Sequence, residues 1–121
     1  MPAAALSPFT TLVLEQMSSF GPVQAKRMFG GCGIFRMGLM FAVVIGDELY
    51  FKADEQNVGR FLARGLKPFT YEAGGRSVSL RYYQAPPETL EEPPAMAEWA
   101  GEAYACALRN QKPPRRPKAR P

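Results

Sequence analysis

Histidine is absent from this sequence of 121 residues. Because histidine is the commonest general base and metal ligand near neutral pH, catalytic pairs of the Ser-His or Cys-His type are excluded. Cysteine is scarce, since Cys32 and Cys106 are too few and too far apart to indicate a disulfide framework or a metal site. The sequence therefore predicts no catalytic residues, no cofactor-binding residues and no metal ligands, and we expect both cysteines to be reduced.

Long hydrophobic runs are absent too. No stretch reaches the roughly 18 apolar residues that a transmembrane helix needs, and the N-terminus MPAAALSPF lacks the basic segment of a signal peptide. We therefore expect a cytoplasmic protein that makes no membrane contact. With 46% hydrophobic and 21% charged residues, the chain can bury a single core without support from disulfides or metal.

Most of the chain lacks net positive charge, although the formal net charge of the whole is +4. Residues 1–110 contain 10 Lys or Arg and 11 Asp or Glu, whereas residues 111–121 contain five basic residues and no acid. These five are Lys112, Arg115, Arg116, Lys118 and Arg120. The same segment has four prolines and no large apolar residue, so we predict one domain over 1–110 and a disordered basic tail over 111–121.

The first half of the chain shows one helix and a group of strands. Ser7 followed by Pro8 is a helix-start signature, and apolar residues at helical spacing predict a helix over 8–20. The segment 27–53 concentrates apolar residues and glycines. It reads as three strands joined by turns at Met37-Gly38 and Gly46-Asp47. Its middle strand is continuously apolar, which is typical of a strand covered on both faces.

The second half predicts a helix, a hairpin and a helix. Asp54 can cap a short helix that ends at Gly65. Strands over 69–72 and 78–83 follow, joined by a glycine turn, and a last helix begins near Pro93. Tight turns make adjacent strands antiparallel. We therefore expect a two-layer α+β domain of order α-β3-α-β2-α with a mostly antiparallel five-stranded sheet.

The glycines at 30, 31 and 33 allow two interpretations. A phosphate-binding loop would need a helix directly after it, and a strand follows here, so a structural bulge is favoured. Cys32 lies among these glycines and is the one candidate for a reactive thiol. Buried filling of the strand is the simpler interpretation of this cysteine, because no basic residue stands next to it.

Two strands carry a basic and aromatic pattern on the faces opposite their apolar residues. The candidate interaction surface consists of Tyr50, Lys52, Arg81 and Tyr83. If helices cover only one side of the sheet, these four residues are exposed together, a pattern that serves partner docking or nucleic-acid stacking. An ordinary solvated sheet face or a homodimer interface is the alternative.

Several motifs occur in order along the chain: RMFGGCGIFRMGLMFA, LYFKAD, PFTY, YYQAP and WAGEA. In this combination the sequence resembles the N-terminal domain of the TfoX/Sxy family, over roughly residues 7–109. The matching residues, which act first as determinants of the fold, are Arg27, Met28, Phe29, Gly30, Gly31, Phe69, Tyr71, Tyr82, Pro86 and Trp99.

The resemblance implies an α-β3-α-β2-α fold and a bacterial protein associated with the regulation of competence genes. Full-length members act as coactivators of transcription alongside a cyclic-AMP receptor protein, and the family is not known for enzymes. Its motifs contain no catalytic residues to carry over. Full-length regulators have a second, helical C-terminal domain, where this sequence has a short basic tail.

The leading hypothesis is a non-enzymatic regulatory module that acts in transcription through a protein partner, while the tail gives weak nonspecific attraction to nucleic acid. One alternative is a small ligand-binding or thiol-based enzyme domain built around Cys32. Another is a structural homodimer with no regulatory role.

Overall fold

Six antiparallel strands form one open sheet in the computed structural model of the chain, which describes residues 6–28 and 31–111. The elements in chain order are α1 (Pro8–Gln16), β1 (Gln24–Met28), β2 (Gly31–Arg36), β3 (Leu39–Ile45), β4 (Glu48–Lys52), α2 (Val58–Ala63), β5 (Pro68–Ala73), β6 (Arg76–Gln84) and α3 (Pro93–Arg109), with short 3-10 turns at Met17–Ser19 and Pro87–Leu90. The strand order across the sheet is β1-β2-β3-β4-β6-β5. The α+β class is thus confirmed.

The prediction of five strands was wrong, because β1 is a strand of its own that pairs with β2 from Gln24–Phe35 to Met28–Gly31. β1 is an edge strand on which Gln24 and Lys26 are exposed, so it lacks the apolar alternation by which a strand is recognised in a sequence. The structure has its β2–β3 irregularity at Ile34–Phe35 rather than at Gly31 or Gly33. Phe29 and Gly30 lie outside the described residues.

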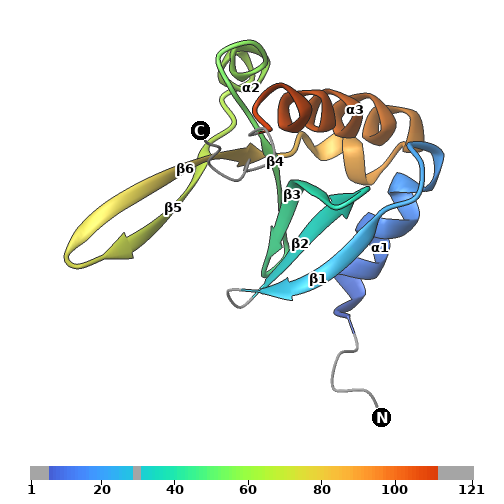
Figure 1. Cartoon of the computed structure of the whole chain (residues 1–121), viewed down its shortest axis with the longest axis horizontal. Coiled ribbons are helices and arrows are strands. Elements are labelled where there is room, and N and C mark those ends of the chain that lie inside the picture. Colours follow the sequence, from blue (N-terminus) through green and yellow to red (C-terminus); the bar gives the residue numbers. More distant parts are fainter. Residues whose placement is uncertain (1–5, 29–30, 112–121) are drawn as a thin grey trace, which may run out of the picture.

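Helices α1 and α3 cover one face of the sheet (Figure 1). The core between the two layers joins residues of α1 and α3 to the inward side chains of β2, β3 and β4. Its fully or nearly fully buried members include Val13, Met17, Ile34, Phe41, Val44, Phe51, Met96, Trp99, Ala100 and Ala103. The alanines of α3 let this helix approach the sheet closely.

Local signals explain the ends of the helices. The backbone N–H of Thr10 donates to Ser7 Oγ at 3.1 Å, and Pro8 stands at the first helical position, as predicted. α1 ends at Gln16, earlier than predicted, and continues as the 3-10 turn. Asp54 does not cap α2 directly, because its carboxylate closes the turn before that helix through the backbone N–H of Gln56 at 2.9 Å.

Asp54 also joins the end of α3 to the loop after β4. Its carboxylate accepts from Arg109 Nε at 3.0 Å, from Arg109 Nη2 at 2.8 Å and from Asn110 Nδ2 at 2.8 Å. The Asp54 side chain is buried, and the hydrogen bonds from Arg109 hold the pKa of its carboxyl well below the usual range. This ion pair, the Asp54–Arg109 pair, has a buried carboxylate and a partly exposed guanidinium, and it holds the end of α3 against the loop after β4.

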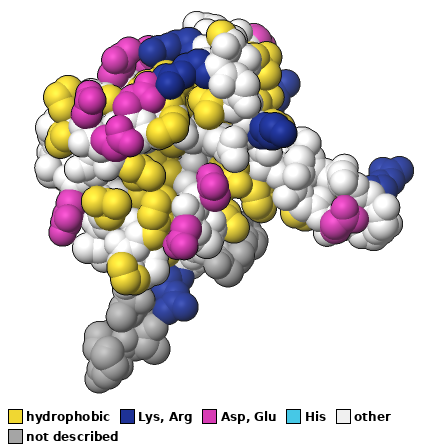
Figure 2. All heavy atoms as spheres, turned by 180° about the vertical axis from the view of Figure 1, so that it is seen from behind, with side chains coloured by type: hydrophobic (Ala, Val, Ile, Leu, Met, Phe, Trp, Pro, Cys, Tyr) yellow, Lys and Arg dark blue, Asp and Glu magenta, His cyan; other side chains and the backbone are white. Residues whose placement is uncertain are grey.

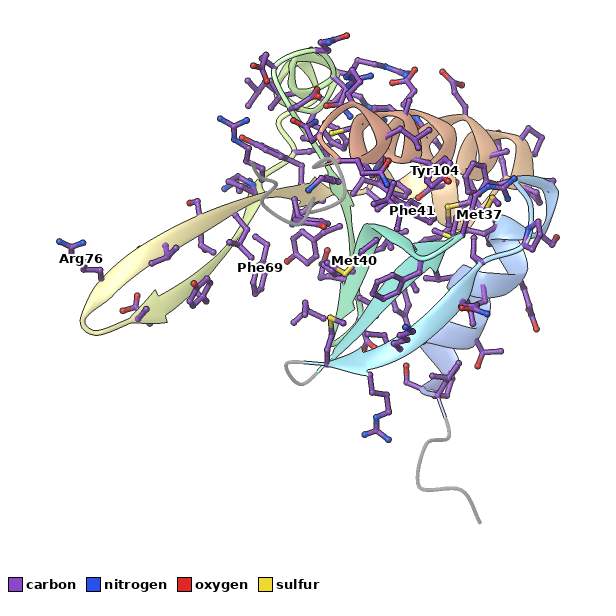
Figure 3. All side chains as sticks on the ribbon, in the orientation of Figure 1. Met37, Met40, Phe41, Phe69, Arg76 and Tyr104 are labelled. Atoms are coloured by element: carbon purple, nitrogen blue, oxygen red, sulfur yellow. The ribbon has the colours of Figure 1, made fainter. Side chains whose placement is uncertain are left out.

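The β2–β3 turn is tight and strained at one residue. Met37 has a φ of 51°, in the left-handed region, and Gly38 follows with a φ of 80°. Met37 is 87% exposed, so no core packing holds its side chain (Figure 3). The turn therefore places an ordinary residue in a conformation that favours glycine and asparagine.

Replacing Asp54 tests the Asp54–Arg109 pair. We expect Asp54→Asn to lower the free energy of unfolding at pH 7 by about 1 to 3 kcal/mol, because the buried carboxylate that accepts from Arg109 and Asn110 is lost. Glu98→Gln is the control. The Arg60–Glu98 pair is exposed, with side-chain exposures of 40% and 59%, so its loss should cost less than about 1 kcal/mol. Equal losses in the two variants would contradict the assignment.

Acid should remove the same contribution. The pKa of Asp54 is lower in the folded state than in the unfolded state, so its stabilising effect is complete above the usual aspartate pKa of about 4. It is lost as the pH falls from there toward the folded-state pKa. We expect the difference between wild type and Asp54→Asn, measured by urea unfolding, to be constant from pH 7 to about pH 5 and to shrink below about pH 4.

Replacing Met37 tests the strained turn. We expect Met37→Asn to raise the free energy of unfolding by about 1 kcal/mol, because asparagine adopts a positive φ at lower cost. Met37→Leu keeps the strain and the exposure and should leave stability unchanged. Thermal unfolding of the three proteins compares them, and a gain in the leucine variant equal to that in the asparagine variant would refute the explanation.

Candidate binding surface on the open face of the sheet

The face of the sheet opposite α1 and α3 carries an apolar trough of about 450 Å³. Within the described residues, the side chains that line it come from strands and from none of the helices. They are Met28, Met40, Val43, Ile45, Phe69, Tyr71, Leu80 and Tyr82. Met40 and Phe69 approach this space from β3 and from the β5–β6 hairpin (Figure 3). We call these eight residues the trough.

A glycine on β2 makes room for the methionines of the trough. A Cβ atom at Gly33 would lie 2.6 Å from Met40 Sδ, closer than side-chain atoms approach one another, and 3.2 Å from Met28 Sδ, which is a tight contact. The absence of a side chain at Gly33 therefore lets two methionines lie across the strand. Methionine is flexible and polarizable, so this part of the trough can adapt to the shape of a bound group.

The β5–β6 hairpin extends away from the body of the domain (Figure 1). Its register pairs Tyr71 with Val78 and Glu72 with Ser77, so the two sides of the hairpin differ in character. The side that continues the open face carries Tyr71, Val78, Leu80 and Tyr82, with Ala73 and Arg76 at its tip, and the other side carries Thr70, Glu72, Ser77 and Ser79. We call residues 68–84 the arm. Its apolar side prolongs the trough, and Tyr71 and Leu80 are 43% and 41% exposed.

Two residues of the predicted interaction surface border the trough. The ring centroid of Tyr50 lies 5.3 Å from that of Phe69, and Lys52 Nζ lies 5.3 Å from the centroid of the Tyr82 ring. Burial raises the pKa of Tyr50, with a smaller effect of Glu48, and burial raises the pKa of Tyr82 to about 12. Both phenols are therefore neutral at pH 7.

The expectation that Arg81 and Tyr83 share this face was wrong. Tyr83 pairs with Phe51, which is buried in the core, and its ring lies 5.5 Å from Phe61. Arg81 Nη1 lies 3.8 Å from Glu55 Oε1, and it lines a separate pocket of about 270 Å³ beside α2 together with Tyr83. β6 turns its apolar side away from the helices, whereas the sequence interpretation had assigned that side to the core.

The sequence of β3 could have predicted an apolar surface on the open face. Its continuous apolar run, Leu39–Ile45, requires cover on both faces, and helices supply it on one face. Tyr71 and Tyr82 were predicted as determinants of the fold, yet both line the trough. Phe69 does so too.

Both cysteines lie in the protein interior. Cys32 on β2 is 8% exposed, and Cys106 on α3 is fully buried. Burial is the main cause that raises the pKa of the Cys106 thiol to about 11. Neither thiol is presented to a ligand. Within residues 6–28 and 31–111, no three His, Cys, Asp or Glu side chains are grouped so that they could hold a metal ion.

The remaining motif residues take structural places. Arg27 lies next to the end of β1 and Gly31 begins β2, whereas Met28, the last residue of β1, lines the trough. Pro86 is buried before the second 3-10 turn. Phe29, Gly30 and the tail residues 112–121 lie outside the described residues. The disorder of the basic tail therefore stays a prediction.

Trp99 lies between a ring and a cation. The ring centroid of Trp99 is 5.2 Å from that of Phe61. The Cζ atom of Arg60, which like Phe61 belongs to α2, lies 4.1 Å from the Trp99 ring centroid. Arg60 also pairs with Glu98 and Glu102, and Arg64 pairs with Glu88. These charges gather over α2 and α3 on the helical side of the molecule (Figure 2), and the pairing with Arg64 lowers the pKa of Glu88 to about 2.

None of the helices in the part of the chain that the structure describes is long and apolar enough to cross a membrane. The trough and the arm together form the candidate binding surface.

Comparison with known proteins identifies the family of the chain. The model of the TfoX N-terminal domain family matches residues 15–107. Protein Sxy of Escherichia coli (strain K12) is 31% identical over 70 residues, which cover 58% of this chain and 34% of Sxy. The chain thus spans about a third of the length of this curated relative. The family match extends from the last turn of α1 to the last turn of α3 and includes every strand. The chain therefore belongs to the TfoX N-terminal domain family.

Proposed function

We propose that this chain is a non-enzymatic regulatory module of the cytoplasm that acts in transcription, in the manner of competence regulators, through protein contacts made by its open face. The observation that carries the proposal is the apolar trough with its projecting arm. Membership of the TfoX N-terminal domain family and similarity to Sxy support the regulatory part.

Protein is a better occupant of this face than nucleic acid. Aromatic rings such as Tyr71 and Phe69 could stack on bases, but binding of phosphates needs an excess of positive charge. Residues 1–110 hold 10 basic and 11 acidic residues. The eight residues of the trough carry no charge. A surface that is apolar in its centre and polar at its rim is typical of protein interfaces.

The trough defines the chemistry of the group it accepts. It has room for several aliphatic or aromatic side chains, and methionines form part of its floor. Tyr50 and Lys52 at its border supply a neutral hydroxyl group and a cation for polar contacts. An extended segment with alternating apolar residues fits such a surface.

A charge placed on the open face tests the proposal. We expect Leu80→Lys to abolish the effect of this protein on transcription, because a lysine on the apolar side of the arm opposes docking of an apolar partner. RNA sequencing compares a strain that lacks the gene with the same strain carrying wild type or variant. Transcripts that change at least about threefold with wild type should return to the deletion level with the variant.

Ser79→Lys is the matched control. Ser79 is the neighbour of Leu80 on the same strand and points to the polar side of the arm. This variant should act as wild type does. The proposal fails if wild type changes no transcripts, or if Leu80→Lys retains the full response while circular dichroism shows both variants folded.

The basic tail gives a second, separable prediction. We expect the purified full chain to bind duplex DNA weakly and without sequence preference through its five basic residues after position 111. Deleting residues 111–121 should remove most of the dependence of the binding constant on salt, whose logarithmic slope is about −0.9 per phosphate contacted. Fluorescence anisotropy at several salt concentrations measures it. An unchanged slope would exclude the tail from binding.

A further inference from the structure

We propose that the occupant of the open face is a second copy of this chain, and that each copy places its arm in the trough of the other. The inference rests on the proposed function for one premise, namely that this face docks protein. It adds the identity of the partner and the way in which the two surfaces fit.

The arm needs a permanent cover. Between Thr70 and Arg81 it consists of two strands, and within the described residues no side chain of this range belongs to the hydrophobic core. A two-stranded hairpin by itself is marginally stable in water. The arm nevertheless concentrates its apolar residues on one side, where Tyr71 and Leu80 remain about two-fifths exposed.

A second copy provides that cover whenever the chain is made. A partner of another kind would leave the arm unsupported until it arrived, whereas an identical chain is present from synthesis onward. Interfaces that are permanent in this sense are also the more hydrophobic ones. The uncharged trough and the apolar side of the arm match that character.

The two surfaces lie where a two-fold axis can exchange them. The trough lies at the root of the arm, between Phe69 and Leu80 of the arm and Met28 and Met40 of β1 and β3. The apolar side of the arm belongs to the same face of the sheet. Two copies turned face to face can therefore each insert an arm into the opposing trough, so that residue i meets residue j and j meets i.

The face is large enough for a stable dimer, and its charged side chains lie around the trough rather than in it. Six strands about 4.8 Å apart and about six residues long give a footprint of roughly 30 Å by 20 Å. The accessible surface of such a face exceeds its projection, which brings it to the order of 800 Å² that a standard interface buries per partner. Lys26 lies on the edge strand β1, and Glu48 and Lys52 lie on β4 beside the trough. Arg76 lies at the tip of the arm, on the same side as Tyr71 and Val78, so in a dimer its charge must lie at the rim of the opposing trough.

The molecular mass in solution tests the inference. Sedimentation equilibrium of the full chain between 1 and 100 µM, concentrations on the order of those where interfaces of this size associate, should give the mass of two chains. Leu80→Lys should weaken self-association by about 100-fold or more, because docking would bury a lysine charge in the opposing trough. Ser79→Lys should leave the dimer intact. A chain that is monomeric over the whole range overturns the inference, as does a Leu80→Lys variant that dimerises as well as wild type.

Cross-linking tests the exchange of arms. A photoreactive phenylalanine derivative in place of Tyr71 should link to Met40 or Val43 of the other copy. Mixing ¹⁴N-labelled and ¹⁵N-labelled chains distinguishes links between copies from links within one chain. Because Tyr71 also lines its own trough, some links within one chain are expected beside those between copies. Links exclusively within one chain, with none between copies, would overturn the inference.

The two proposals fail separately. A dimer with exchanged arms and no effect on any transcript would contradict the proposed function and leave this inference standing. A monomer that still changes transcripts would do the opposite.

Discussion

The rest of this structure depends on one constraint, which is that helices cover only one of the two faces of the sheet. The sheet has six strands, and α1 and α3 pack on one side of it. Antiparallel sheets built in this way usually turn polar residues to the uncovered side. Here the uncovered side is apolar at its centre, because β3 is apolar along its whole length and β6 directs Leu80 and Tyr82 outward. The sheet thus has a fully packed hydrophobic core on one face and, on the other face, an apolar surface suited to binding another molecule.

Polar contacts keep the helices on their own side. The Asp54–Arg109 pair ties the last turn of α3 to the end of β4, and Trp99 packs between Phe61 and the Arg60 guanidinium. The charged pairs between α2 and α3 stand at the surface and contribute little each. The Asp54–Arg109 pair has the larger effect, since its carboxylate is buried and is left without its charged partner when Arg109 is replaced. These contacts position α3 without involving any residue of the trough.

Most of the fold could be predicted from the sequence because its signals are local. Ser7-Pro8 starts α1, Met37-Gly38 and Gly74-Gly75 turn the hairpins, and alternation on β4 places Leu49 and Phe51 in the core. β1 was missed because an edge strand with exposed polar residues has no such alternation. The candidate surface was half right. Tyr50 and Lys52 lie on the open face, but the side of β6 that faces the helices is set by its pairing with β4, a contact between residues far apart in the chain. No local sequence pattern therefore predicts which side of β6 faces the helices.

The outer part of the arm contributes nothing to the core, and this gives its length an unusual freedom in evolution. Residues can be added or removed at the Gly74-Gly75 turn in pairs, one on each strand, without changing the register at the root or the side to which each remaining residue points. A single residue added to one strand would move every side chain between the insertion and the turn to the opposite face of the arm. Relatives of this chain can therefore differ in reach while sharing one core, and reach would set which surfaces they can span.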